Sequence, residues 1–95
     1  MAYPVGPKMR WSTQIEFLDG TVISGTDDED AIERWRRLAA WTDFGAEDRD
    51  RWMNLVLDRA RVFYGAGLIG ISAASSPGQI LDSLAAERCI LVRRR

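Results

Sequence analysis

Histidine is missing from this chain of 95 residues, and cysteine occurs only once, at Cys89. These are the two side chains that most readily titrate or bind metal ions near neutral pH. Without them, a metal centre would depend on carboxylates alone, and an enzyme would need paired carboxylates, an activated Ser or Lys, or a cofactor. We therefore expect a non-enzymatic protein with no resident metal or cofactor.

Long hydrophobic runs are also missing. The longest weakly polar stretch, residues 66–74, is far shorter than the roughly 20 residues that cross a bilayer. Residues 1–10 have no apolar core and contain two prolines, unlike a signal peptide. A single cysteine cannot form an internal disulfide, so we expect a cytoplasmic protein without a membrane segment.

Lysine is scarce, with one residue against 12 arginines, a ratio typical of a GC-rich genome such as that of a bacterium or its phage. The net charge of −1 hides an acidic cluster at residues 27–30 and a basic tail at Arg93, Arg94 and Arg95. Two interpretations remain open. The two ends neutralise each other within the fold, or each forms a charged surface that faces a partner.

The hydrophobic content of 46% and the four tryptophans indicate a packed core. We expect a flexible arm over residues 1–9 and one domain over residues 10–95. Residues 10–25 predict a β-hairpin, because apolar and polar side chains alternate from Trp11 to Phe17 and Asp19-Gly20 follows as a turn. A three-residue loop places Ile15 opposite Ile23, which gathers the apolar side chains on one face.

A first helix is predicted after Thr26, which with Glu29 would form a capping box. Its apolar stripe contains Ala31, Ile32, Trp35, Leu38, Ala39 and Thr42, and the pairs Asp30–Arg34 and Glu33–Arg37 lie outside it.

A second helix is predicted over residues 47–64, with an apolar arc that covers more than half of its circumference. Such a helix must be covered on two sides, by the rest of the domain or by another subunit. The arc contains Trp52, Met53, Leu55, Val56, Leu57, Ala60, Val62, Phe63 and Tyr64.

Residues 65–76 are rich in small side chains and could hold a short helix or strand over residues 68–72. Ser76, Pro77 and Gln79 then predict the capped start of a short third helix. A final strand is predicted over residues 88–93. Joined to the hairpin, it gives an α+β fold: a small antiparallel or mixed sheet packed by two main helices and a short third one.

The glycines Gly65, Gly67 and Gly70 match the spacing G-x-G-x-x-G, and residues 65–74 resemble the phosphate-binding turn of flavin- and nicotinamide-dependent Rossmann enzymes. That resemblance implies dinucleotide binding at this loop. The preceding residues have helical rather than strand spacing, however, which favours a helix-ending glycine at Gly65.

Protein–protein binding is the function that we expect, in a small accessory or regulatory protein that docks on a partner or forms a homodimer. Trp41 with Arg34 and Arg37 is the candidate anchor, because tryptophan and arginine are enriched at interface hot spots. Trp41 could instead fold back into the core.

The second helix adds further candidates. Met53, Leu57 and Tyr64 are predicted to form an exposed self-association face. Arg59 falls inside the apolar arc, as an interfacial anchor or as an ion-pair partner of Asp43 or Asp82. The alternative function is nucleic-acid binding through the arginine tail, where Arg93, Arg94 and Arg95 would contact phosphates.

Overall fold

The computed structural model describes residues 11–39 and 48–95, in which three strands form one antiparallel sheet. The strands are β1 (Thr13–Phe17), β2 (Val22–Gly25) and β3 (Ile90–Arg94), and β1 lies between the other two. This confirms the predicted α+β fold in which an N-terminal hairpin is joined by a C-terminal strand.

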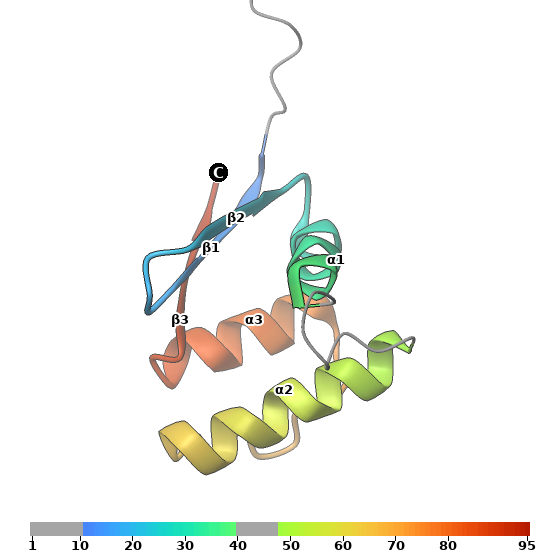
Figure 1. Ribbon diagram of the computed structural model, residues 1–95, viewed down its shortest axis with the longest axis vertical. Coiled ribbons are helices and arrows are strands. Elements are labelled where there is room, and N and C mark those ends of the chain that lie inside the picture. Colours follow the sequence, from blue (N-terminus) through green and yellow to red (C-terminus); the bar gives the residue numbers. More distant parts are fainter. Residues whose placement is uncertain (1–10, 40–47) are drawn as a thin grey trace, which may run out of the picture.

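Helices α1 (Asp28–Ala39), α2 (Arg49–Tyr64) and α3 (Pro77–Ala86) lie on one side of the sheet (Figure 1). Side chains therefore alternate along each strand between a covered face and an open face. Ile23 is buried on the covered face, whereas its neighbour Val22 is 48% exposed.

The register of the hairpin is the one that the apolar pattern predicted. Ile15 lies opposite Ile23, and the Phe17 N–H donates to the Thr21 carbonyl oxygen at 2.8 Å. The loop between them contains three residues, and its glycine, Gly20, has a φ of 93°, a conformation that other residues rarely adopt. The turn chemistry and the burial pattern thus select the same register.

The cap of α1 lies one residue later than predicted. The Asp27 carboxylate accepts the Asp30 N–H at 2.7 Å, and the Asp30 carboxylate accepts the Thr26 N–H at 2.9 Å. The prediction of Thr26 and Glu29 as the capping pair is therefore wrong, because a carboxylate is a stronger acceptor for these amides than the threonine hydroxyl. The predicted ion pair between Asp30 and Arg34 is present at 3.0 Å.

Helix α2 is one continuous helix that ends at the glycines, as predicted. The Asp48 side chain accepts the Asp50 N–H at its start. Gly65 closes it in the left-handed conformation, with a φ of 66°. The helix begins at Arg49, two residues after the predicted start.

Residues 65–76 form turns instead of the helix or strand that residues 68–72 could have held. The guanidinium of Arg61 donates to the carbonyl oxygens of Leu68 and Ile71 at 3.3 and 2.9 Å. The Leu68 carbonyl also accepts the Ile71 N–H at 3.2 Å, so the loop is held by a backbone turn as well as by the Arg61 side chain.

The predicted cap of α3 is confirmed. The Ser76 hydroxyl accepts the Gln79 N–H at 3.2 Å, and the Gln79 side-chain oxygen accepts the Ser76 N–H at 3.2 Å. Pro77 occupies the first turn, where its missing N–H leaves no hydrogen bond unmade.

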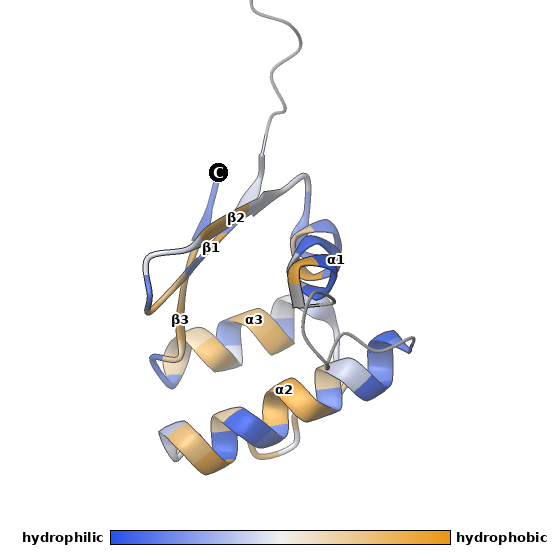
Figure 2. Cartoon of the chain, viewed as in Figure 1, coloured by the Kyte–Doolittle hydropathy of each residue, from blue (hydrophilic) through white to orange (hydrophobic). Residues whose placement is uncertain are grey.

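The core lies between the sheet and the helices, and all three helices contribute to it. Hydrophobic residues run along α2, α3 and the strands, whereas α1 is mostly hydrophilic (Figure 2). In the ranges that the structure describes, no helix is both long and apolar enough to cross a membrane. The largest fully buried apolar side chains are Trp52, Ile15, Ile32, Met53, Leu57, Ile80, Leu81 and Leu84.

An ion-pair cluster joins the acidic and basic ends of the chain. Asp28 at the start of α1 pairs with Arg94 of β3 at 3.1 Å, although the two lie 66 positions apart. Arg94 also pairs with Asp82 of α3 at 2.7 Å, and the Thr13 hydroxyl donates to Asp28 at 2.6 Å. The first interpretation of the charge pattern, neutralisation within the fold, therefore holds for Asp28 and Arg94.

Candidate functional site

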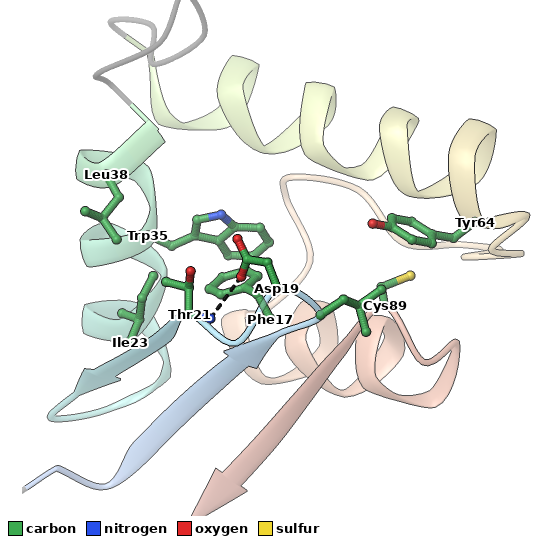
Figure 3. A pocket seen from close by; sticks show the side chains of 9 residues that line it. Phe17, Asp19, Thr21, Ile23, Trp35, Leu38, Tyr64 and Cys89 are labelled. Atoms are coloured by element: carbon green, nitrogen blue, oxygen red, sulfur yellow. Dashed lines mark hydrogen bonds between the residues drawn. The ribbon is translucent and has the colours of Figure 1, made fainter.

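A groove opens where the hairpin turn and α1 face the C-terminal end of α2. Phe17 ends β1, Trp35 comes from the middle of α1, Tyr64 ends α2 and Cys89 precedes β3. Figure 3 shows Trp35 and Tyr64 on opposite sides of this space. We call it the aromatic groove. It has a volume of about 460 Å³ and is lined by Phe17, Leu18, Asp19, Thr21, Ile23, Trp35, Leu38, Tyr64 and Cys89.

Three aromatic rings stack edge to face beneath the groove. The Phe17 and Trp35 ring centroids lie 5.0 Å apart, and those of Trp35 and Trp52 lie 5.3 Å apart. Trp52 is almost fully buried, so the row of rings extends from the groove into the core. This geometry is the favourable one for aromatic pairs and holds the Trp35 ring in place.

A narrower cavity of about 240 Å³ continues the groove toward the core. It shares Phe17, Trp35, Tyr64 and Cys89 with the groove. The additional lining residues are Trp52, Val56, Arg59, Ala60, Leu84 and Ile90, of which only Arg59 is charged. The concave surface is therefore largely apolar in its deeper part, whereas Asp19 and Thr21 add polar groups at the hairpin turn.

Exposed apolar side chains surround the mouth of the groove. Leu18 is 66%, Leu38 52% and Tyr64 56% exposed. The exposure of Leu38 contradicts the prediction that it faces the core with the rest of its stripe, because β2 and the hairpin turn leave this end of α1 uncovered.

Asp19 is the acidic residue that lines the groove. Its carboxylate accepts the Thr21 N–H at 2.9 Å, and this hydrogen bond lowers the pKa of Asp19. The carboxylate is therefore charged at neutral pH, and one of its two oxygens is bound within its own turn.

A shallower trough of about 370 Å³ adjoins the groove, between β2 and α1. It is lined by Val22, Ile23, Ser24, Arg34, Arg37 and Leu38, and it shares Ile23 and Leu38 with the groove. We call it the β2–α1 trough.

The trough contains two of the residues predicted to anchor a partner, Arg34 and Arg37. Arg37 does not form the predicted pair with Glu33, because Glu33 binds Arg36 at 3.2 Å instead. The third predicted anchor, Trp41, lies outside the described residues.

The predicted self-association face on α2 is wrong for two of its three residues. Met53 and Leu57 are fully buried in the core. Both belong to the core cluster, together with Ile15 of β1 and Leu81 of α3, so that side of the apolar arc is covered within the fold. Tyr64 remains exposed at the end of the helix, and the exposed apolar residues near it are Val62, Phe63 and Ile69.

Arg59 is exposed on α2. Its guanidinium lies 5.9 Å from the centroid of the Phe63 ring, close enough for a cation–π contact. Of the two carboxylates predicted to pair with it, Asp82 binds Arg94, and Asp43 lies outside the described residues.

The glycine loop does not have the setting of a phosphate-binding turn, and its first three amides are bound within the fold. It follows helix α2, whereas such a turn follows a strand. The Gly65 and Ala66 N–H groups bond to the Ala60 carbonyl oxygen, and the Gly67 N–H donates to the Glu87 carboxylate at 3.2 Å. Gly70 has a φ of 76° and supplies a tight turn.

The arginines of the tail contact groups on the molecule itself. Arg94 binds the carboxylates of Asp28 and Asp82, and Arg93 lies 3.7 Å from the Glu16 carboxylate. The Arg95 guanidinium stacks 3.9 Å from the centroid of the Trp11 ring. The three guanidinium groups are thus spread over different contacts instead of forming one basic surface.

Cys89 is a buried free thiol, as predicted, although it precedes β3 rather than lying inside it. Burial raises its pKa, and the charge of Glu87 raises it further. The thiol is therefore protonated at neutral pH and contributes to the groove as a small apolar group. Among the described residues, no group of three or more acidic or cysteine side chains could hold a metal ion.

Comparison of the chain with protein-family models, with curated proteins and with solved structures finds no significant match. Its function therefore has to be argued from these surfaces.

Proposed function

We propose that this protein is a non-enzymatic binding module that holds a partner protein in the aromatic groove. The observation that carries the proposal is the apolar concave surface over the stacked rings of Phe17 and Trp35, surrounded by exposed Leu18, Leu38 and Tyr64. Aromatic side chains at the centre of such a surface are the usual hot spots of protein interfaces.

The lining of the groove suits a polypeptide better than a small metabolite. Small-molecule sites combine an apolar pocket with a few converging polar groups that fix the orientation of the ligand. Here the polar residues of the groove, Asp19 and Thr21, lie together on the hairpin turn, where one oxygen of the carboxylate accepts the Thr21 N–H, and Arg59 lies over Phe63. Shape and apolar contact would therefore select the ligand.

The proposed location is the cytoplasm, because the free thiol of Cys89 suits a reducing compartment. Nucleic-acid binding has less support, because the three arginines of the tail already contact Glu16, Asp28, Asp82 and Trp11.

The test uses two substitutions of equally exposed residues. Tyr64 in the groove and Leu91 on the open face of the sheet are both 56% exposed. Affinity capture with mass spectrometry is run on the wild type, on Tyr64→Ser and on Leu91→Ser, with thermal melts to verify that each is folded. We expect Tyr64→Ser to weaken partner binding by at least about tenfold and Leu91→Ser to leave it unchanged.

Light scattering on the purified protein identifies the case in which the partner is a second copy. If the wild type is a dimer and Tyr64→Ser is a monomer, the groove is a homodimer interface. If the folded Tyr64→Ser protein retains every partner of the wild type, the proposal is wrong.

A further inference from the structure

The free edge of β2 borders the β2–α1 trough and offers backbone groups for pairing. The Phe17 N–H of β1 donates to the Thr21 carbonyl, and Ile15 of β1 lies opposite Ile23. The backbone polar groups of Thr21 and Ile23 therefore point toward β1. In an antiparallel pair, the residues between them point the other way. The N–H and C=O groups of Val22 and Ser24 therefore point away from the sheet.

The two edge strands of the sheet differ in the residues that protect them from pairing with a further strand. Proteins usually protect edge strands with charged side chains, proline or bulges. The edge strand β3 carries Arg93 and Arg94, whereas the sequence of β2, Val-Ile-Ser-Gly, contains neither a charge nor a proline. Of these two edges, β2 is the one open to an added strand.

The trough next to this edge is basic. Arg34 and Arg37 from α1 line it, and no carboxylate does so among the described residues. The Nε–H group of Arg34 donates to the Asp30 carboxylate. The guanidinium has further N–H donors, since it carries five in all. A second copy of this chain would bring the same two arginines to the edge, and like charges would oppose its docking.

We propose that β2 binds an extended segment of the partner protein as a fourth strand, and that this segment carries an acidic residue two positions from an apolar one. Residues two apart on a strand face the same side. The acidic side chain would meet Arg34 and Arg37, and the apolar one would meet Leu38 and Ile23, where the trough joins the groove. This inference rests on the proposed function, because it names the chemistry of the partner.

Pairing with the edge can be tested separately from binding in the groove. The probes are peptides selected on the wild-type protein from a random-peptide display library and then synthesised. Val22→Pro removes one outward N–H group without breaking a bond to β1. An ester in place of the Val22 amide also removes this N–H group but does not introduce the proline ring. The ester is used if the Val22→Pro protein does not fold. The matched control is an ester at Val92, whose N–H points off the free edge of β3.

We expect the selected peptides to carry the acidic and apolar residues two positions apart and to protect the Val22 and Ser24 amides from hydrogen exchange. Removal of the Val22 N–H should weaken binding by about fivefold to tenfold, and the Val92 ester should leave it unchanged. Arg37→Glu should abolish binding, and a peptide with lysine in place of its acidic residue should restore it.

Peptides that require Tyr64 but are indifferent to the Val22 ester and to Arg37→Glu would overturn the edge pairing and leave the groove proposal standing. Peptides that require Val22 and Arg37 but not Tyr64 would support the edge and refute the groove. If no peptide is selected, or if the selected peptides are indifferent to all three changes, both proposals fail.

Discussion

The substitution Gly25→Ala is the most direct test of how the hairpin packs against α1. A methyl group at this buried position would lie 2.7 Å from the Ala31 Cα and 2.9 Å from the Asp30 carbonyl carbon, and closer still to the Ala31 nitrogen. Carbon atoms in contact are normally about 3.5–4.0 Å apart. All three neighbours are backbone atoms of the first turn of α1, so no side chain can rotate to make room.

Overpacking of this kind destabilises a protein by about 1–3 kcal/mol, and a backbone neighbour favours the upper end of that range. For a domain of this size, each kcal/mol lowers the melting temperature by about 4–8 °C. We therefore expect Gly25→Ala to reduce the free energy of unfolding by about 3 kcal/mol and the melting temperature by about 12–24 °C, as measured by circular dichroism.

Gly67→Ala is the matched control, because a methyl group there would meet only the far end of the Glu87 side chain, at 3.9 Å. We expect it to change the free energy of unfolding by less than about 0.5 kcal/mol. If Gly25→Ala melts at the same temperature as Gly67→Ala, the close approach of β2 to α1 is refuted.

Three further predictions concern the ion pairs, the loop and the thiol. Burial would raise the pKa of Asp28, but hydrogen bonds from Arg94 and Thr13 prevail and lower it. The stabilisation is therefore present above the unfolded pKa and is lost as the pH falls through the lower folded value. Asp28→Asn should be about 1–2 kcal/mol less stable than the wild type at pH 7, and urea titrations should show this difference vanish once the pH falls below the lowered pKa of Asp28. Arg61→Met should destabilise by about 1–2 kcal/mol in urea, because the Ile71 carbonyl loses the Arg61 donor and the Leu68 carbonyl loses one of its two donors; an unchanged midpoint would contradict this. Cys89 should react slowly with iodoacetamide at pH 7 and rapidly in urea, because its pKa is raised and its side chain is buried; equal rates would show that the thiol is accessible.

Local patterns were sufficient to predict the elements of this fold. The alternation around Ile15 and Ile23 defines the hairpin register, and Ser76 with Gln79 defines the start of α3. Each signal involves residues close in sequence, where backbone hydrogen bonding and side-chain period act together. The Thr26 cap failed for the same local reason, since Asp27 and Asp30 compete for the same amides.

The candidate site could not be predicted in the same way. The apolar arc of α2 shows which positions are hydrophobic, but the packing of α2 against the rest of the fold decides that Met53 is buried and Phe63 exposed. The groove brings together Phe17, Trp35 and Tyr64 from three elements, and no spacing within the sequence connects them. Arg34 and Arg37 could be grouped from the sequence because they lie three positions apart on one helix, and both line the trough.

The central position of β1 determines how the chain could be divided. Ile15 lies between Ile23 of β2, from the same part of the chain, and Val92 of β3, from the far part. A fragment that holds β1, β2 and α1 lacks one side of the sheet, and a fragment that holds α2, α3 and β3 has a strand without a neighbour (Figure 1). We therefore expect the two halves of a chain cut between α1 and α2 to reassemble with each other, through the pairing of β1 with β3 and the ion pair of Asp28 with Arg94.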